Sequence, residues 1–329
     1  MIRLAHKKSE RQDDMSRSTI STFQLFALIP DEESAKTYLE SCIWKGAPKC
    51  PKCKGIERIT LRKDGFYMCN ACELKFTIRT GTIFERSHVP LHKWLYAMYL
   101  LVTARKGISS IQLAKEIGIT QKSAWFVLSR LREACGNDTR TLAGIVEVDE
   151  TFIGGLERNK HKNKKLNEGR GAVGKTAVIG MRERNGNMVA MPISRNDMDT
   201  IQDAIKEKVS SGSRVMTDDH RSYIGLSGKA FKHDVVKHSA DEYARGDVNT
   251  NGIEGVWAVM KRGMHGVYHH ASKKHLNRYV DEFAFRLNEG KVSRHTLDRL
   301  ASFVDLVSGC RITHEQLTKG KTWFDAEIV

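Results

Sequence analysis

The chain has 329 residues, 40% of them hydrophobic and 28% charged, so it is long enough for two or three folded domains and its composition excludes overall disorder. Its formal net charge of +15 predicts a polyanionic partner, which is usually nucleic acid. Binding to a membrane surface is the weaker alternative, because no basic amphipathic anchor helix is evident. The most apolar stretch, residues 94–103, is about half the length of a bilayer crossing, so we expect no membrane contact.

Seven cysteines, an odd number, and a basic N-terminus with no apolar segment after it predict a reducing, cytoplasmic location. Residues 1–46 are expected to form a polar, mobile tail of about 20 residues and one helix over residues 31–44. Acidic side chains at the start of this helix suit the positive end of its dipole.

Residues 47–82 contain two Cys-x-x-Cys pairs at the spacing of a zinc ribbon. Each pair can present two thiolates to one tetrahedral ion, and four thiolates leave no open position, so we predict a structural Zn²⁺ without catalysis. Four unrelated thiols or a redox pair are the alternatives. The predicted ligands are Cys50, Cys53, Cys69 and Cys72, with short strands around Ile59, Leu61, Phe66, Tyr67, Phe76 and Ile78.

Residues 83–138 have helical patterns. One helix is expected from Pro90 through Ala104, and two more, over residues 108–118 and 119–132, meet at a tight turn at Gly118. This geometry fits a helix-turn-helix, in which the front of the second helix enters the DNA major groove; a helical hairpin used as a spacer is the alternative. The residues predicted to contact DNA are Thr120, Gln121, Lys122 and Ser123. The predicted buried faces hold Ile111, Ala114 and Ile117, then Ala124, Val127, Leu128 and Leu131.

Residues 139–290 change to alternating strand and helix patterns, which predict an α/β domain with a mixed sheet flanked by helices. Asn185-Gly186 is a strong hairpin signal. The basic stretch 156–171 is expected to be a flexible loop or a clamp on DNA phosphates. Residues 291–329 are expected to add a helical tail. The predicted strands cover residues 144–153, 175–181, 188–193, 214–218 and 231–236, and the predicted helices cover about 197–209, 251–262 and 272–288.

Three acidic residues stand in contexts that suit metal-binding carboxylates. Asp149 lies in the first predicted strand of this domain, Asp218 closes the fourth, and Glu254 opens a helix. Mg²⁺ prefers oxygen ligands but keeps several waters, so two or three carboxylates and substrate phosphates are enough to bind it. Two such ions can hold the attacking and leaving oxygens of an in-line phosphoryl displacement.

The chain resembles the bacterial and archaeal insertion-sequence transposases that join an N-terminal zinc ribbon to a DDE domain of ribonuclease-H-like, integrase-type fold. The resemblance runs from about residue 50 to residue 288. Four segments in this order carry it. They are Arg79-Thr-Gly-Thr-Ile-Phe-Glu85, Val148-Asp-Glu-Thr-Phe-Ile-Gly-Gly155, Asn251-Gly-Ile-Glu-Gly-Val-Trp257 and His275-Leu-Asn-Arg-Tyr-Val-Asp-Glu-Phe283.

The resemblance implies that Asp149, Asp218 and Glu254 form the catalytic triad and hold Mg²⁺ or Mn²⁺. Lys261 lies seven residues after Glu254, where many DDE enzymes carry a basic residue, and about two helical turns place it on the same helix face. We expect Lys261 and the adjoining Arg262 to contact DNA.

Several neighbouring residues stay open as alternatives or supporting groups. Some relatives use asparagine as the third catalytic residue, which keeps Asn251 as a candidate ligand. On the first strand, Glu147 shares a face with Asp149, whereas Glu150 points to the opposite face. His220 can hydrogen-bond a scissile phosphate. The remaining candidates are Asp219, His238 and Asp241.

Together these features predict a DNA transposase that binds the terminal inverted repeats of an insertion sequence, cleaves a strand and transfers it to target DNA. A homodimer or larger multimer is expected because two element ends must be paired. One alternative is a catalytically inactive, sequence-specific DNA-binding regulator derived from a transposase. Another is a junction-type nuclease on the same fold.

Overall fold

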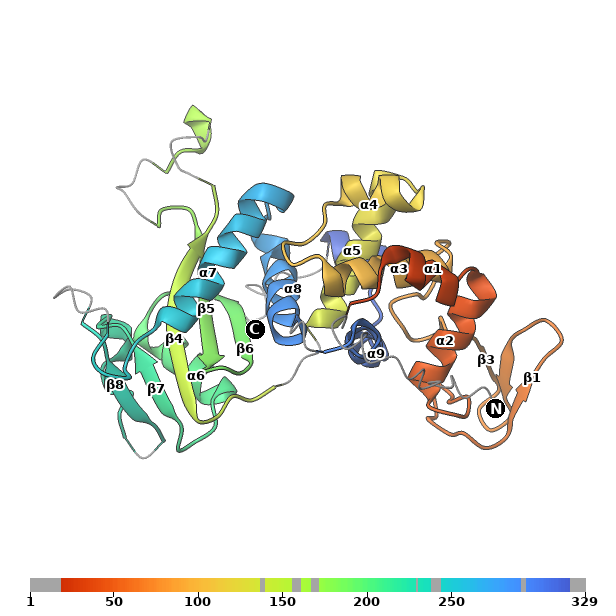
Figure 1. Cartoon of the computed structure of the whole chain (residues 1–329), viewed down its shortest axis with the longest axis horizontal. Helices are drawn as coiled ribbons and strands as arrows, with labels where there is room; N and C mark the ends of the chain where they lie inside the picture. The colour runs from red at the N-terminus through yellow and green to blue at the C-terminus, as the bar shows by residue number, and fades with distance from the viewer. Residues whose placement is uncertain are drawn as a thin grey trace, which may run out of the picture.

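The computed structural model describes residues 19–136, 140–155, 161–166, 172–228, 230–237, 244–290 and 294–319. The predicted tail before residue 19, most of the basic stretch 156–171, the candidates His238 and Asp241, and residues 320–329 lie outside this description. The described residues form a cysteine-rich part, a helical part and a sheet part along the long axis (Figure 1). Within them, no helix combines the length and apolarity that a membrane span needs.

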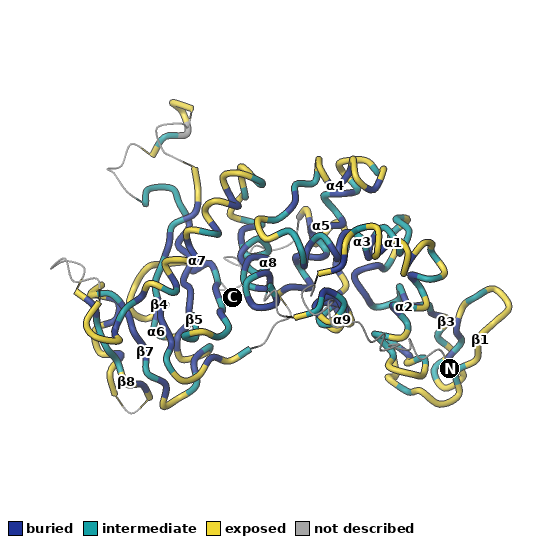
Figure 2. Tube along the Cα trace, in the orientation of Figure 1, coloured by how far each residue is buried: buried dark blue, intermediate teal, exposed yellow. Residues whose placement is uncertain are grey.

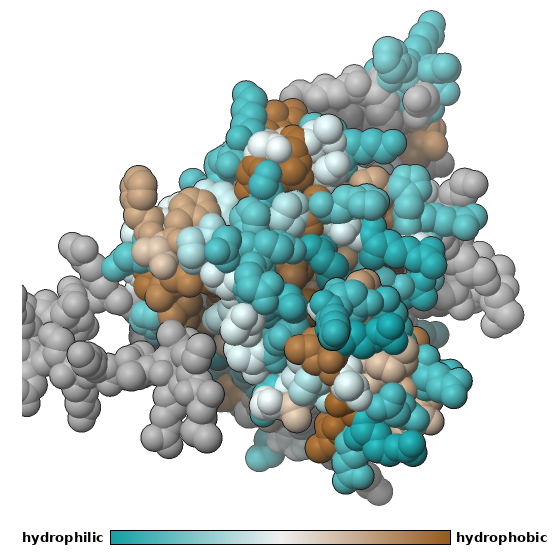
Figure 3. Space-filling model, turned by 90° about the vertical axis from the view of Figure 1, so that its right-hand side faces the viewer, coloured by the Kyte–Doolittle hydropathy of each residue, from teal (hydrophilic) through white to brown (hydrophobic). Residues whose placement is uncertain are grey.

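The cysteine-rich part is a three-stranded antiparallel sheet in the order β1-β2-β3. Its small core is closed by Trp44, at the end of α2, whose ring meets the rings of Tyr67 and Phe76 edge-on at 4.9 and 6.2 Å. The strands form where they were predicted, although Phe66 and Ile78 lie just outside them. The bounds are α2 Glu32–Trp44, β1 Ile59–Leu61, β2 Tyr67–Cys69 and β3 Leu74–Phe76. Seen from this end, the molecule is mainly hydrophilic with small hydrophobic patches (Figure 3).

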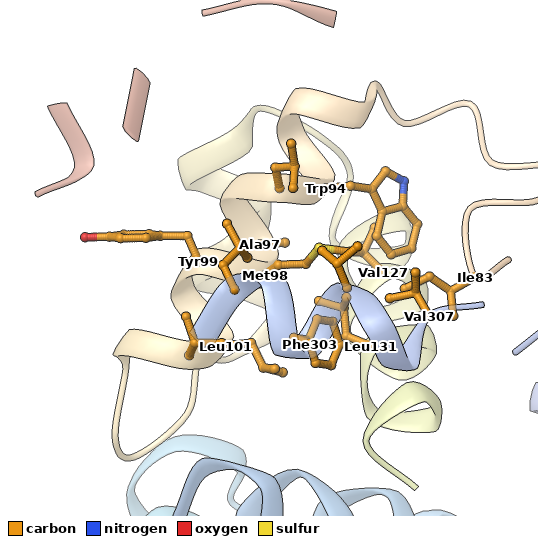
Figure 4. Packing of buried hydrophobic residues seen from close by; sticks show 14 of the residues in the cluster. Ile83, Trp94, Ala97, Met98, Tyr99, Leu101, Val127, Leu131, Phe303 and Val307 are labelled. Carbon is orange, nitrogen blue, oxygen red and sulfur yellow. The ribbon is translucent and has the colours of Figure 1, made fainter. Parts of the chain in front are cut away.

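The helical part has one hydrophobic core built from segments far apart in the sequence. Figure 4 shows Phe303 and Val307, from α9 and its C-terminal end, packed among side chains of α3 and α5 such as Met98 and Leu131. The helix α1 was not predicted. The helix α9, which lies in the predicted helical tail, is part of this core. The bounds are α1 Thr22–Leu28, α3 Leu91–Thr103, α4 Ser110–Ile117, α5 Gln121–Cys135, α9 Thr296–Leu306 and α10 His314–Lys319.

The helix α4 ends at Gly118, whose left-handed backbone (φ 60°) makes the predicted turn into α5. The buried face predicted for α5 is confirmed. The face predicted for α4 is partly wrong, because Ile111 is 60% exposed. Leu113 and Ile117, one helical turn apart, set the buried stripe, and Ile111 lies on the far side of the helix from Leu113.

The sheet part is a five-stranded mixed sheet in the order β6-β5-β4-β7-β8. The pairs β4–β5 and β5–β6 are antiparallel, whereas β4–β7 and β7–β8 are parallel. The predicted mixed sheet is therefore confirmed, as is the hairpin at Asn185, where φ is 61°. The bounds are β4 Ile145–Ile153, β5 Thr176–Glu183, β6 Met188–Ile193, β7 Arg214–Thr217 and β8 Lys232–Val235.

Helices cover both faces of this sheet. Because side chains alternate along a strand, Val146 and Val148 of β4 join a core with α6 (Met198–Lys208) on one face. On the other face, Ile153 packs in a core with α7 (Asn251–Gly263) and α8 (Leu276–Glu289). Figure 2 shows buried segments along the sheet and the helices that pack on it. Asp149 alternates onto the face that α7 covers.

A buried cluster of charges joins the helical part to the sheet part. Glu282 of α8 is fully buried and accepts hydrogen bonds from Arg132 of α5 (2.6 Å), Arg286 (2.9 Å) and the Tyr268 hydroxyl (2.7 Å). The Arg132 guanidinium also lies over the Tyr279 ring at 4.1 Å. Burial alone would raise the pKa of Glu282, but the charges of Arg132 and Arg286 outweigh it and lower the pKa to about 2.

Replacing Glu282 with alanine is expected to lower the free energy of unfolding by about 3–5 kcal/mol, because it strands two buried guanidinium groups. Urea denaturation at pH 7 measures this change. The wild-type contribution is present above the ordinary carboxyl pKa of 4.5 and is lost as pH falls towards 2. Asp203→Ala, which breaks an exposed pair with Lys206, is the control and should change stability by at most about 0.5 kcal/mol. Equal effects of the two variants would contradict this role for Glu282.

Candidate active site and zinc centre

Two of the predicted carboxylates lie side by side because their strands run parallel. The register between β4 and β7 pairs Ile145 with Arg214 and Glu147 with Met216. Continued by two residues, the same register places Asp149 beside Asp218, immediately after β7 ends. The sheet topology thus brings together two acidic residues that are far apart in the sequence.

The third carboxylate comes from the helix that covers this face of the sheet. In Figure 1, α7 crosses β4 and β5. Its Trp257 donates a hydrogen bond from Nε1 to Asp149 Oδ2 at 3.0 Å. Glu254 lies one turn earlier, where its Oε1 accepts a hydrogen bond from the Thr250 hydroxyl at 3.0 Å. Glu254 is exposed, whereas Asp149 and Asp218 are half-buried.

The other two carboxylates act electrostatically on Asp149. Burial raises the pKa of Asp149 to about 6, and the negative charges of Asp218 and Glu254 add to the rise. Burial and repulsion at Asp149 favour either a bound proton or a bound cation there. Hard oxygen donors of this kind are the ligands that Mg²⁺ and Mn²⁺ prefer.

Among the described residues, only four cysteines gather their ligand atoms within 4.8 Å of one another, so the oxygens of the three carboxylates are spread more widely. A two-ion site accepts such a spread. With ions about 3.5–4 Å apart and metal–oxygen distances of about 2 Å, ligands on opposite sides can stand about 8 Å apart. The donor set is of the oxygen type that such hard cations bind.

The neighbouring acidic candidates have other partners. Glu147 is 3% exposed, and its Oε1 accepts a hydrogen bond from Arg184 Nη2 at 3.1 Å. Its Oε2 accepts one from the backbone N–H of Ile253 at 3.0 Å, in the first turn of α7. Glu150 lies on the opposite sheet face beside Tyr223, where burial raises its pKa to about 7. Asp219 is exposed next to Asp218.

The predicted supporting residues lie in the segment after β7 and on α7. The backbone N–H of His220 donates to Asp218 Oδ1 at 3.0 Å, while its ring Nδ1 accepts from Ser222 N at 3.4 Å. Asn251 is the exposed first residue of α7. Lys261 and Arg262 are exposed in the last turn of the same helix.

The four cysteines form a centre in the three-stranded sheet. Sγ of Cys50 lies 3.5 Å from that of Cys72, and Sγ of Cys53 lies 3.6 Å from that of Cys69. A tetrahedral zinc ion with Zn–S bonds of about 2.3 Å needs sulfur atoms about 3.8 Å apart, so the sulfurs fit zinc and are too far apart for disulfides. The two turns are alike, because Lys54 N donates to Cys50 O and Glu73 N donates to Cys69 O.

Four of the six residues predicted to contact DNA occupy the start of α5. Thr120 is the N-cap, and its hydroxyl accepts from Ser123 N at 3.1 Å. Gln121 Nε2 donates to Ser110 Oγ at 2.9 Å, which ties α5 to α4. Lys122 is exposed. The Ser123 hydroxyl also hydrogen-bonds with that of Thr120 at 2.9 Å, so three of the four side chains hold the turn together.

Sequence reasoning missed the contact between Trp257 and Asp149. It lies within one of the quoted segments, and a buried indole N–H needs an acceptor, so the signal was present. The acceptor was not predictable, since it lies 108 residues earlier in the chain.

Comparison with known proteins identifies two matching domain families and two relatives. A family model described as an ISXO2-like transposase domain matches residues 141–288, and a transposase zinc-ribbon domain matches residues 30–75. An uncharacterized protein in transposable element ISH50 of Halobacterium salinarum is 29% identical over 268 residues, 78% of this chain and 90% of that protein. An uncharacterized transposase-like protein of Haemophilus influenzae is 32% identical over 93 residues, 28% of this chain and 74% of that protein.

Solved structures resemble the chain only distantly. A chain of a simian T-cell lymphotropic virus intasome has 13% identity and a TM-score of 0.28, over 59% of this chain and 65% of that chain. A chain of a Mos1 transpososome has 13% identity and a TM-score of 0.22, over 67% of this chain and 80% of that chain. Likeness at this level carries no argument. The matched domains and relatives do, and they show that the chain belongs to the family of insertion-sequence transposases with a zinc ribbon and an ISXO2-like transposase domain.

Proposed function

We propose that this protein is a DDE-type DNA transposase that cleaves the ends of an insertion sequence and joins them to target DNA. The observation that carries the proposal is that Asp149, midway along β4, lies within electrostatic reach of Asp218, just after β7, and of Glu254 on α7, within the matched transposase domain. The strand order supports a ribonuclease-H-like fold for this domain. Three consecutive antiparallel strands are followed by two parallel strands added at the β4 edge.

Asp149, Asp218 and Glu254 would hold two Mg²⁺ or Mn²⁺ ions, which supply charge neutralisation and activation of the attacking oxygen in phosphoryl transfer. Asp149 and Asp218 are half-buried, which limits water around them and so strengthens their interaction with cations. Lys261 and Arg262 lie two turns along α7 from Glu254 and would bind DNA phosphates leading into the site. His220 and Asn251 would contact the scissile phosphate or orient its neighbours.

The zinc ribbon and the helices α4 and α5 would bind the terminal inverted repeats. Support for a helix-turn-helix comes from the left-handed turn at Gly118 and from the capped start of α5, beside which Lys122 is exposed. The net charge of +15 favours double-stranded DNA as the partner. A cytoplasmic, nucleoid-associated dimer or larger multimer would pair the two ends.

Lys122→Ala is expected to weaken binding to terminal DNA and to reduce the slope of log K against log salt by about 1, because one phosphate contact is lost. Fluorescence anisotropy at several salt concentrations measures the slope. Lys206→Ala, an exposed lysine on α6, is the control. If the two variants behave alike, α4 and α5 act only as a spacer.

Incubating the full-length protein with labelled terminal DNA, target DNA and Mg²⁺ tests the proposed function. The expected product is a labelled 3′ end joined to the target. Binding without cleavage would favour a catalytically inactive regulator. Cutting without joining would favour a junction-type nuclease.

A further inference from the structure

The strand β4 and the helix α7 are joined at two points, one helical turn apart. Glu147 accepts the backbone N–H of Ile253, and Asp149 accepts the indole N–H of Trp257. Between these contacts, the helix also carries Glu254. The distance between the proposed metal ligands Asp149 and Glu254 is therefore set by how α7 lies on β4.

The ring of Trp257 reaches Asp149 only because Gly180 lies beneath it. Gly180 is the cross-strand partner of Asp149 on β5, so a side chain there would point to the same sheet face. A Cβ atom on Gly180 would stand 2.4 Å from the Trp257 ring, well inside van der Waals contact. The missing side chain leaves the space that the indole fills.

This contact does more than bury an aromatic ring. Trp257 is 4% exposed and packs in the core between α7 and the sheet, so its own rotamer is fixed. Its N–H donates to Asp149 Oδ2 and, together with the backbone N–H of Glu150, holds the orientation of that carboxylate, whose remaining lone pairs can bind a cation. Outer hydrogen-bond partners of this kind orient metal ligands and tune their affinity.

We propose that Trp257, seated on Gly180, is a positioning residue that presents Asp149 to the catalytic cations. This inference rests on the proposed function, because it takes Asp149 as a metal ligand. The alternative is a purely structural role for Trp257, in which Asp149 acts only as the hydrogen-bond acceptor for the buried indole N–H. In that case, loss of the N–H would affect stability without changing metal affinity.

The test measures Mn²⁺ binding to the full-length protein by electron paramagnetic resonance, together with the Mg²⁺ dependence of cleavage of terminal DNA. Trp257→Phe keeps an aromatic ring but has no donor. Mn²⁺ binding that is lost in Asp149→Asn identifies the site, and we expect Trp257→Phe to weaken that binding by about 10–100-fold. The Mg²⁺ concentration needed for cleavage should rise by the same factor. Binding to terminal DNA should not change. Wild-type Mn²⁺ affinity and Mg²⁺ dependence in Trp257→Phe would overturn the inference.

Two further proteins keep this test decisive. Val256→Ala removes buried packing from the same helix and should lower thermal stability without changing Mn²⁺ affinity; an equal loss of affinity would assign the effect to packing and overturn the inference. If Trp257→Phe does not fold, benzothienylalanine at position 257 replaces the N–H by sulfur in a ring of the same shape, with the same expected and contrary results.

The two proposals fail in different ways. Full cleavage activity in Asp149→Asn would overturn the proposed catalytic site and the positioning role with it. An inactive Asp149→Asn beside a fully wild-type Trp257→Phe would overturn the positioning role alone.

Discussion

Replacing Asp149 with asparagine is expected to lower the rate of strand cleavage by at least about 10³-fold, because metal ions contribute several kcal/mol of transition-state stabilisation. Binding to terminal DNA should stay within about twofold of wild type, since the predicted DNA-reading helices belong to a different core. Gel assays with labelled terminal DNA measure both quantities. Asp218→Asn and Glu254→Gln should behave in the same way.

The control for this series is Asp219→Asn, which alters the exposed acid next to Asp218. It should cleave at close to the wild-type rate. If Asp219→Asn is inactive and Asp218→Asn is active, the assignment at the end of β7 is wrong by one residue. Cleavage by both Asp149→Asn and Glu254→Gln would remove the catalytic assignment altogether.

The same carboxylate gives a pH signature without any DNA. In the metal-free protein, the pKa of Asp149 is raised from 3.8 to about 6, so the folded state binds the extra proton between these values. Its contribution to stability is therefore full below pH 3.8 and is lost as pH rises through about 6. A bound cation offsets the destabilisation that the ionised Asp149 carboxylate causes above this pH. At pH values well above 6, added Mg²⁺ should raise the melting temperature of the wild-type protein. Below pH 6 the rise should be much smaller, and Asp149→Asn should show none.

Removing zinc should have the second large effect. The core of the cysteine-rich part consists of little more than Trp44, Tyr67 and Phe76 around the thiols, which is too small to fold without a metal. Structural zinc binding contributes about 10–16 kcal/mol in zinc-finger peptides. Cys69→Ser is therefore expected to unfold residues 47–82 and to abolish tight binding to terminal DNA, while the helical and sheet parts stay folded.

Zinc content by mass spectrometry, limited proteolysis and DNA binding measure this outcome. Wild-type protein should carry one zinc per chain, and Cys69→Ser should carry none and be cut within residues 47–82. Cys42→Ala, a half-buried cysteine on α2 outside the centre, should keep its zinc. One equivalent of zinc retained by Cys69→Ser would contradict the four-thiolate centre.

Much of the fold was predictable because local patterns specify it. Alternating and continuous apolar runs located the strands of the mixed sheet, and Asn185-Gly186 located its hairpin. The cysteine spacing located the zinc centre without knowledge of the fold, because a tetrahedral ion needs two close pairs. Asp149 and Asp218 were recognisable as a pair only through their strand contexts and the family resemblance.

Contacts between distant segments were not predictable from such patterns. Nothing in the periodicity of residues 296–306 says that Phe303 packs against α3 and α5, and nothing near Arg132 points to Glu282, 150 residues away. The exposure of Ile111 likewise depends on which face of α4 packs against the core of the helical part. Glu147 has two partners, Arg184 and the N-terminus of α7, and both contacts likewise depend on long-range packing. These contacts distinguish Glu147 from the proposed metal ligands.

The most direct test of the central claim is to locate bound metal in crystals of the full-length protein grown with MnCl₂, from the anomalous scattering of manganese. We predict manganese beside the middle of β4 and the end of β7, with carboxylate oxygens of Asp149, Asp218 and Glu254 among its ligands. Manganese bound elsewhere, with these three side chains uncoordinated at saturating concentration, would contradict the account.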